Sequence, residues 1–262
     1  MASRPTAIEA LATQPSAGAL VLDFDGVLAP IVQDPETSAM PERAAVSLAQ
    51  LAASLGTLAV VSGRPASFLA SKVHVPGIRL LGSYGMEQVR DGNVELSPAA
   101  AQWLAAVTQA RDELSGLPGA LPGVRIETKP ASVAVHWRQA ADPTTAAAEV
   151  QSATARVAAS TGLRLEPGKL VVELRPPIDV DKGSAVATLI REARPVVTVY
   201  AGDDLGDLPA LRVVRDAGGY GLVVHHGAET DPELLASADQ VIAGTDGFAD
   251  WLAELTRAAC GE

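Results

Sequence analysis

Apolar runs that end directly in acidic residues constrain the fold of this chain most. Residues 19–22 form the run Ala-Leu-Val-Leu, and Asp23 and Asp25 follow it at once, separated by a single residue. A second run, residues 196–201, leads into an acidic cluster made of Asp203, Asp204 and Asp207. Carboxylates this close repel one another and raise each other's pKa, unless a cation or a proton-transfer role compensates. The pattern therefore predicts a metal-binding reaction site at the ends of two buried strands.

The same order of elements continues through much of the chain and predicts a parallel sheet. Residues 58–61 form another apolar run that ends in Ser62, Gly63 and Arg64, and an amphipathic helix beginning at Pro41 precedes it. Further strands are expected at residues 78–81, 221–224 and 240–243, with a last helix near residues 247–257. Strands that alternate with helices form an open sheet that binds ligands beyond its carboxyl ends. We expect an α/β fold with a doubly wound, mostly parallel sheet.

Residues 97–178 interrupt this order and predict an inserted domain. A helix with Trp103, Leu104, Val107, Ala110 and Leu114 on one stripe precedes two short strands at residues 124–129 and 132–138. A second helix from residue 143 precedes strands at residues 163–166 and 169–175. This helix-strand-strand repeat indicates a small α+β domain, the cap domain, inserted into a core made of residues 1–96 and 179–262.

The strands of the insert alternate between charged and apolar residues. Because neighbouring residues of a strand point to opposite faces, one face is expected to be apolar and covered by helices, and the other polar and open. The polar face would carry Glu127, Lys129, His136, Lys169 and Glu173. From the pattern alone, an ordinary solvated surface explains this face better than a binding surface does.

Composition narrows the class of protein. The chain has 262 residues with 20 basic and 31 acidic side chains, a formal net charge of −11, which disfavours nucleic acid or an anionic membrane as partner. Its single cysteine excludes an intrachain disulfide. No apolar stretch approaches the about 18–20 residues of a membrane span, and no signal-peptide pattern begins the sequence. A soluble cytoplasmic protein is the expectation.

Taken in chain order, the motifs resemble those of the haloacid dehalogenase-type phosphatase superfamily: Asp-x-Asp at Asp23 and Asp25, then Ser62, Lys182, and the acidic cluster at Asp203. The resemblance implies that Asp23 is the nucleophile that attacks phosphorus, and that Asp25 is the general acid and base. It also implies a metal held by the Asp23 side chain, the Asp25 backbone carbonyl and the Asp203 side chain. Oxygen ligands and phosphate chemistry favour Mg²⁺ over zinc.

The remaining motif residues would serve the phosphate group. Ser62 and Gly63 would donate a hydroxyl and a backbone N–H, and Lys182 would stabilise developing negative charge. Asp204 and Asp207 are expected to hold metal-bound waters or Lys182 rather than to bind the metal directly. Taken singly, Ser-Gly-Arg is a common turn and a lysine at a helix start is usually solvated, so the prediction depends on their order along the chain.

Residues 129–138 and 168–176 resemble the cap signatures of trehalose-6-phosphate phosphatases, and Gly82-Ser83-Tyr84-Gly85-Met86-Glu87 is similar to that family's Gly-Ser-His-Gly-Ala-Glu segment. The resemblance implies an Mg²⁺-dependent phosphatase that hydrolyses trehalose 6-phosphate through an aspartyl-phosphate intermediate. It also implies hinges near residues 97 and 178 and leaves open a functional link to a trehalose-6-phosphate synthase. Sugar contacts are expected from Arg64, Glu127, Lys129, His136, Lys169 and Glu173. Tyr84 departs from the family's usual His, and Val27 stands where many relatives have Thr.

Three alternatives remain open at this point. The substrate could be another sugar phosphate or a cyclitol phosphate, since charged side chains suit any polyol. The chain could be a catalytically silent regulatory module, although such a module has no need for mutually repelling acids. A phospho-accepting receiver also places Asp at strand ends, but the insert and the second acid at Asp25 count against it. His225 and His226 are expected to belong to a loop rather than to a metal site.

Overall fold

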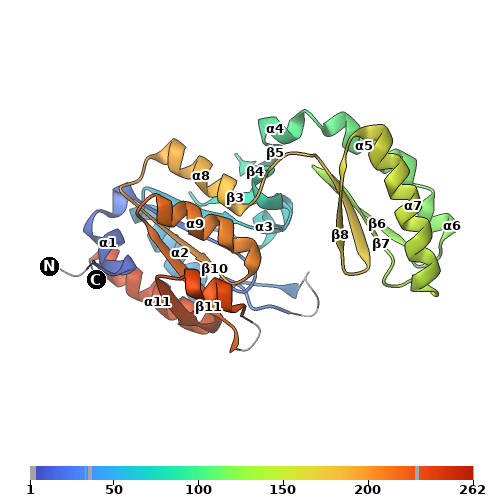
Figure 1. Ribbon diagram of the computed structural model, residues 1–262. Coiled ribbons are helices and arrows are strands. Elements are labelled where there is room, and N and C mark those ends of the chain that lie inside the picture. Colours follow the sequence, from blue (N-terminus) through green and yellow to red (C-terminus); the bar gives the residue numbers. More distant parts are fainter. Residues whose placement is uncertain (1–3, 33, 35–36, 228–229, 262) are drawn as a thin grey trace. The chain divides into compact units, whose positions relative to one another are not determined.

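The computed structural model describes residues 4–32, 34, 37–227 and 230–261 (Figure 1). It contains two compact units, Met1–Val94 with Val180–Glu262, and Glu95–Asp179. Among the described residues, no helix combines the length and the apolar character that a membrane-spanning segment requires.

The first unit is built on an eight-stranded sheet with the order β12-β11-β10-β1-β2-β3-β4-β5. The strands are β1 (Gly18–Leu22), β2 (Thr57–Val61), β3 (Arg79–Gly82), β4 (Glu87–Arg90), β5 (Asn93–Leu96), β10 (Val197–Gly202), β11 (Tyr220–His225) and β12 (Gln240–Ala243). The pairs from β12 to β3 are parallel, and β4 runs antiparallel to β3. The expected parallel sheet is confirmed. The strands β4 and β5 were not predicted, because their sequences are short and polar and contain no apolar run.

Helices cover both faces of this sheet, as Figure 1 shows. The helices are α1 (Ala7–Thr13), α2 (Glu42–Ser54), α3 (Ala66–Lys72), α8 (Lys182–Ala193), α9 (Leu208–Asp216), α10 (Pro232–Ser237) and α11 (Gly244–Cys260), with 3-10 turns at Pro15–Ala17, Ser83–Gly85 and Leu205–Asp207. Leu20 and Leu22 of β1 pack in a core with α1, α2 and α11. Val21, between them, packs on the other face with α8 and α9. The sheet is therefore doubly wound, as expected.

The central strand β1 marks the point where the strand order reverses. The chain proceeds from β1 through β2 and β3 on one side, and returns through β10, β11 and β12 on the other. In open α/β sheets, the carboxyl ends of strands at such a switch point border a crevice. The topology thus brings the residues after β1, β2 and β10 to one edge, although they are far apart in sequence.

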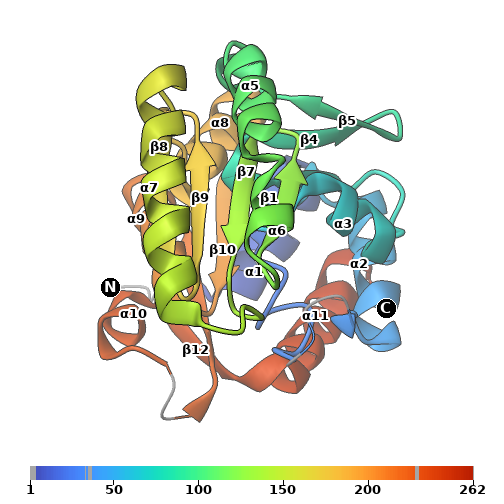
Figure 2. The same cartoon turned by 90° about the vertical axis from the view of Figure 1, so that its right-hand side faces the viewer.

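The second unit contains a four-stranded antiparallel sheet with the order β6-β7-β9-β8. Its elements are α4 (Pro98–Ala101), α5 (Leu104–Leu114), α6 (Leu117–Ala120), β6 (Arg125–Lys129), β7 (Ser132–His136), α7 (Pro143–Thr161), β8 (Arg164–Gly168) and β9 (Val171–Arg175). Figure 2 shows α5 and α7 lying along this sheet. Val133, Val135, Val172 and Leu174 face these helices in one apolar core. The expected helix-strand-strand repeat and its apolar face are confirmed.

Two expectations for this unit are wrong in detail. Lys169 does not lie in a strand, because β8 extends to Gly168 and the turn Lys169-Leu170 joins it to β9. Leu170 has a φ of 60°, a left-handed turn conformation that a hydrophobic period cannot reveal. Leu104 was expected on the buried stripe of α5, but it is 50% exposed. The buried residues of this helix are Val107, Ala110 and Leu114, and Leu104 lies outside that stripe.

Candidate active site

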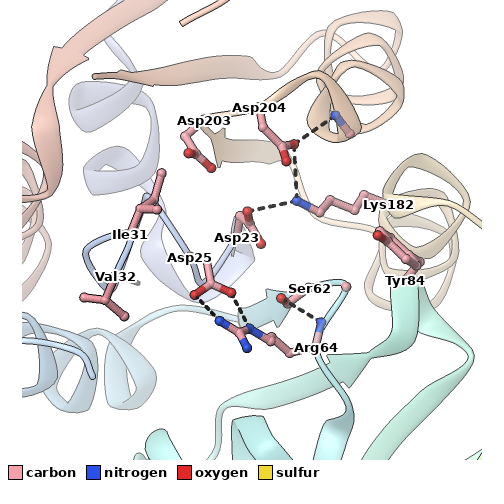
Figure 3. Close-up of a pocket in the computed structure, with 12 residues that line it drawn as sticks. Asp23, Asp25, Ile31, Val32, Ser62, Arg64, Tyr84, Lys182, Asp203 and Asp204 are labelled. Atoms are coloured by element: carbon pink, nitrogen blue, oxygen red, sulfur yellow. Dashed lines mark hydrogen bonds and ion pairs between the residues drawn. The ribbon is translucent and has the colours of Figure 1, made fainter. Parts of the chain in front are cut away.

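A pocket of about 430 Å³ opens at the carboxyl ends of the strands of the first unit (Figure 3). Most of the predicted core-site residues line it, together with two exposed apolar residues and one tyrosine. The lining residues are Asp23, Asp25, Ile31, Val32, Ser62, Gly63, Arg64, Tyr84, Lys182, Asp203, Asp204 and Gly206. The structure therefore brings four separate sequence motifs to one place.

Asp23 occupies the first position after β1 and is almost completely buried. Its backbone N–H donates to the carbonyl of Ala201 in β10 at 2.9 Å, which extends the parallel ladder by one residue beyond the strand. Burial raises the pKa of the Asp23 carboxyl to about 7, with Asp207 adding to the effect and Lys182 opposing it. The protein thus holds a carboxylate where its negative charge is poorly solvated and needs a cationic partner.

Lys182 supplies that partner from the first turn of α8. Asp181 caps this helix by accepting the N–H of Ser184 at 2.7 Å, which fixes the position of the lysine. Its Nζ lies 2.9 Å from Asp23 Oδ2 and 2.7 Å from Asp207 Oδ1. Burial lowers the pKa of Lys182, but the surrounding carboxylates of Asp23, Asp207 and Asp204 outweigh burial and hold the pKa above its ordinary value. The ammonium therefore stays charged.

Asp207 organises the floor of the site from a fully buried position, with 0% of its surface exposed. Its Oδ1 accepts hydrogen bonds from Lys182 Nζ and from the hydroxyl of Tyr200. Its Oδ2 accepts the backbone N–H groups of Asp203 and Asp204 at 2.8 and 3.1 Å. Both carboxylate oxygens are thus engaged, so Asp207 holds Lys182, Tyr200 and the backbone of Asp203 and Asp204.

Carboxylate oxygens of Asp23, Asp203 and Asp207 lie within 4.8 Å of one another, a spacing that suits a metal ion. Because the oxygens of Asp207 already accept four hydrogen bonds, Asp23 and Asp203 are the better ligands. Burial and the nearby negative charges of Asp23, Asp207 and Asp204 raise the pKa of Asp203 to about 8. A divalent cation would neutralise this charge, and the hard oxygen donors fit Mg²⁺. The donor set therefore fits a divalent cation.

Gly26 allows the turn after Asp23 to approach Asp203 closely. Its φ is +76°, and a Cβ atom at this position would lie 1.9 Å from Asp203 Oδ2. The carbonyl of Gly26 also accepts a hydrogen bond from His226 Nε2 at 2.8 Å. His226 was interpreted as a loop residue. In the structure it braces this turn, a contact between residues 200 positions apart that no local pattern signals.

Asp25 lies in the same pocket but is paired differently. Arg64 donates from Nε to Asp25 Oδ2 at 2.7 Å and from Nη2 to Asp25 Oδ1 at 2.9 Å, a bidentate ion pair. The buried hydroxyl of Ser38 donates to Asp25 Oδ1 at 3.1 Å. Arg64 was expected to contact the sugar. Here its guanidinium orients the residue expected to transfer protons.

Ser62, Gly63 and Tyr84 form the opposite wall of the pocket. Ser62 is buried directly after β2, and its Oγ accepts the backbone N–H of Arg64 at 3.2 Å. The Tyr84 ring lies against Gly63, where a Cβ would be 2.8 Å from the Tyr84 hydroxyl. Ser83 and Tyr84 have φ values of 48° and 61°. Left-handed conformations cost non-glycine residues roughly 1–2 kcal/mol each, so this wall is strained.

The remaining predicted residues belong to the polar sheet face of the second unit. Glu173 Oε1 accepts from Lys129 Nζ at 3.1 Å and from the hydroxyl of Ser132. His136 Nε2 lies 2.9 Å from Glu127 Oε2. The strand register places these two clusters on the same sheet face, as the alternation predicted. Lys169 lies in the hairpin turn, where its carbonyl accepts from Arg138.

Known proteins similar to this chain share one family. The model of the trehalose-phosphatase family matches residues 21–238. A trehalose-phosphate phosphatase of Mycobacterium marinum is 35% identical over 224 residues, covering 83% of this chain and 56% of the relative. The protein of that name in Mycobacterium tuberculosis is 36% identical over 249 residues, covering 90% and 62%. The chain thus spans a little more than half the length of these relatives.

Solved structures agree on the fold. A trehalose-6-phosphate phosphatase related protein matches with a TM-score of 0.73 at 22% identity, covering 93% of this chain and 99% of that one. A haloacid dehalogenase-like hydrolase from Bacteroides thetaiotaomicron matches with a TM-score of 0.62 at 14% identity, covering 91% and 99%. The chain has the fold of haloacid dehalogenase-like hydrolases.

The Gly26→Ala variant should lose most of its affinity for divalent cations, because the added methyl group displaces the Asp203 carboxylate. An ångström of misplacement commonly costs about a hundredfold in function. Gly92→Ala is the matched control, since Gly92 has a φ of +77° but nothing within 4 Å of its Cβ position. Calorimetric titration with Mg²⁺ should show weakened binding only for Gly26→Ala. Equal binding by both variants would mean that the close approach to Asp203 does not matter.

Stabilisation by Mg²⁺ should increase with pH. The pKa values of Asp23 and Asp203 are raised from 3.8 to about 7 and about 8. Without a cation, the folded protein retains protons that the unfolded chain releases, so this contribution to stability is present below about pH 4 and is lost as pH rises towards 8. Mg²⁺ binds the ionised carboxylates and must displace these protons below about pH 7.

The test compares the Mg²⁺-induced rise in melting temperature near pH 6 and near pH 8.5. Below about pH 7, the apparent affinity for Mg²⁺ should fall about tenfold for each unit by which the pH is lowered and for each proton displaced. Asp203→Asn should abolish the rise, whereas Asp216→Asn, which removes an exposed carboxylate at the end of α9, should preserve it. A rise that is equal at both pH values would contradict the assignment of these carboxylates as cation ligands.

Proposed function

The chain belongs to the trehalose-phosphatase family, and we propose that it hydrolyses trehalose 6-phosphate to trehalose and inorganic phosphate. The observation that carries this proposal is the contact of 2.9 Å between Asp23 and Lys182, at the switch point of the sheet and beside Asp203. Relatives named trehalose-phosphate phosphatases support the substrate. A synthase that makes trehalose 6-phosphate would then supply the substrate.

Mg²⁺ would be held by the carboxylates of Asp23 and Asp203, with the Asp25 backbone carbonyl as the third protein ligand that the family resemblance implies. When bound, it neutralises the charge of the phosphate, so that a carboxylate can approach phosphorus. Ser62 Oγ and the Gly63 N–H would hold the phosphate oxygens, and the Lys182 ammonium would stabilise charge that develops in the transition state.

The reaction would proceed in two displacements at phosphorus. Lys182 binds Asp23 Oδ2, so the other carboxylate oxygen, Oδ1, would attack phosphorus and form an aspartyl phosphate. The bond between phosphorus and the sugar oxygen breaks, and Asp25 protonates the departing alkoxide. Water then attacks the aspartyl phosphate while Asp25 accepts its proton, which releases phosphate and restores Asp23.

The ion pair between Asp25 and Arg64 must open for this proton transfer. Both oxygens of Asp25 accept hydrogen bonds from the guanidinium. A phosphate group offers the same bidentate geometry to arginine. We infer that the arriving phosphate draws Arg64 away from Asp25, which then takes up a proton from solvent and faces the leaving group as a carboxylic acid. Arg64 would thus contact the phosphate end of the substrate.

Sugar recognition would come from the second unit, acting as the cap domain. Its polar sheet face presents donors and acceptors in preformed pairs, Glu127 with His136 and Lys129 with Glu173. Sugar hydroxyls can both donate and accept, so they can form hydrogen bonds with both members of each pair, which a ligand without hydroxyls would not form. Lys169, in the turn between β8 and β9, would add a further donor beside this face.

Another sugar phosphate or a cyclitol phosphate is the alternative substrate, because the same charged groups suit any polyol. A silent regulatory module is disfavoured by the cluster of Asp23, Asp203 and Asp207, in which burial and the nearby negative charges raise the pKa values of Asp23 and Asp203. Such a cluster is typical of catalytic sites. The choice among substrates therefore depends on measurement.

Release of inorganic phosphate should be fastest from trehalose 6-phosphate in a panel that includes sucrose 6-phosphate, glucose 6-phosphate and a cyclitol phosphate. Asp23→Asn should keep the fold and lose activity by several powers of ten on every substrate, because an amide does not attack phosphorus. Phosphate release is followed with and without Mg²⁺. Preference for another member of the panel would replace the proposed substrate, and a variant that kept more than about a hundredth of the rate would exclude Asp23 as nucleophile.

Glu173→Ala should lower kcat/KM for trehalose 6-phosphate by about a hundredfold, since each lost charged hydrogen bond is worth roughly 1.5–3 kcal/mol. Hydrolysis of p-nitrophenyl phosphate, which has no sugar, should change only a few-fold. Glu149→Ala on the exposed side of α7 is the control and should affect neither substrate. Equal losses on both substrates would assign Glu173 a structural role instead.

A further inference from the structure

Glu87, the first residue of β4, is a buried acid that the proposed reaction does not use. It has 0% exposure. Its Oε1 accepts the hydroxyl of Ser83 at 2.7 Å, and its Oε2 accepts the backbone N–H of Ala66 at 2.9 Å. Burying a carboxyl group is costly unless its oxygens are hydrogen-bonded. The two contacts explain how the group is tolerated, and they also tie two segments together.

The first segment is the strained wall of the pocket. Ser83, Tyr84 and Gly85 all have positive φ values, 48°, 61° and 94°. Two consecutive non-glycine residues keep such a conformation only where the surroundings hold them firmly. Glu87 holds the side chain of Ser83. The backbone N–H groups of Ser83 and Tyr84 donate to the carbonyls of Arg64 and Ser62 at 2.8 and 2.9 Å.

The second segment is the loop that carries Ser62, Gly63 and Arg64 towards α3. Glu87 binds the N–H of Ala66, two residues beyond Arg64 and at the start of that helix. This loop is therefore held by backbone bonds to the strained wall and, beyond Arg64, by Glu87. Packing between the two segments is tight, because a Cβ at Gly82 would lie 2.1 Å from the Ala66 nitrogen.

We propose that Glu87 is a positioning residue for phosphate-ester hydrolysis. It holds the loop of Ser62, Gly63 and Arg64 against the wall of Ser83 and Tyr84, and so sets where the phosphate group binds. The Tyr84 ring, which lies against Gly63, is set by the same contacts. This inference rests on the proposed function. Because Glu87 is completely buried, it acts through these residues and does not touch the substrate.

Variants of Glu87 and Ser83 distinguish a positioning role from a contribution to stability alone. Glu87→Ala removes both contacts, and Ser83→Ala removes one. Glu87→Gln keeps both, because its amide oxygen can accept the Ala66 N–H while its NH₂ group donates to Ser83 Oγ. Thr256→Val is the matched control. It removes a buried hydroxyl that donates to Leu252 at 2.7 Å within α11, away from the pocket.

The experiment measures kcat and KM for p-nitrophenyl phosphate, the affinity for inorganic phosphate by calorimetry, and the melting temperature of each variant. We expect Glu87→Ala to lower kcat about 30-fold or more and to weaken phosphate binding about tenfold, as expected for a displaced binding loop. Ser83→Ala should show smaller losses in the same two quantities. Glu87→Gln should stay within about threefold of the unchanged protein, and Thr256→Val should lose only melting temperature.

Three results would overturn the inference: folded Glu87→Ala with constants within twofold of the unchanged protein, equal losses in Glu87→Ala and Glu87→Gln, or Ser83→Ala that matches Thr256→Val. If Glu87→Ala does not fold, the comparison of Ser83→Ala with Glu87→Gln decides. If the unchanged protein hydrolyses no phosphate ester, the proposed function fails. The affinity for inorganic phosphate, which needs no turnover, then still tests whether Glu87 positions the loop.

Discussion

The buried ammonium of Lys182 is the contact on which the site depends. It lies between Asp23 and Asp207, with Asp204 at 3.9 Å. Its positive charge stabilises the ionised form of these carboxylates, which burial would otherwise disfavour. Removing one partner from such a buried group commonly costs about 3–5 kcal/mol, because the remaining charges are left uncompensated. The lysine also joins the start of α8 to Asp23 after β1 and to Asp207 in the turn after β10, so the same contacts that balance charge align three segments. The fold of this unit and the chemistry of the pocket therefore both require the Lys182 ammonium.

Sequence reasoning could predict the parallel sheet and the gathering of Asp23, Ser62 and Asp203 because both follow from local rules. Apolar runs form strands, alternation with helices makes the strands parallel, and parallel strands end at the same edge. The contacts of Arg64 with Asp25 and of His226 with Gly26 follow no period and join residues far apart, so they emerge only from packing. The turn at Lys169 was missed for another reason, since a left-handed Leu170 violates the preference on which strand prediction relies. Glu87 was part of a recognised segment, yet its burial was invisible without the fold.

The two units carry different kinds of information about function. The first contains the groups that any phosphate monoester needs, a nucleophile, an ammonium and carboxylates for a cation. The second contains paired charges on a sheet face, which a solvated surface would also display. The family match includes residues of both units. The proposed substrate depends most on the second unit.

The left-handed backbone at Tyr84 restricts which side chains can face the phosphate pocket. Residues with φ near 60° are mostly glycine, asparagine, aspartate and histidine, and β-branched residues are nearly excluded there. Histidine, the usual residue in the resembling family segment, satisfies this restriction more easily than tyrosine does. A substitution at Tyr84 must therefore be compatible with the left-handed backbone before its contact with the substrate matters. Selection for a new substrate would meet fewer acceptable residues here than at an ordinary pocket position, and diversification is expected at other pocket positions, where the backbone is not left-handed.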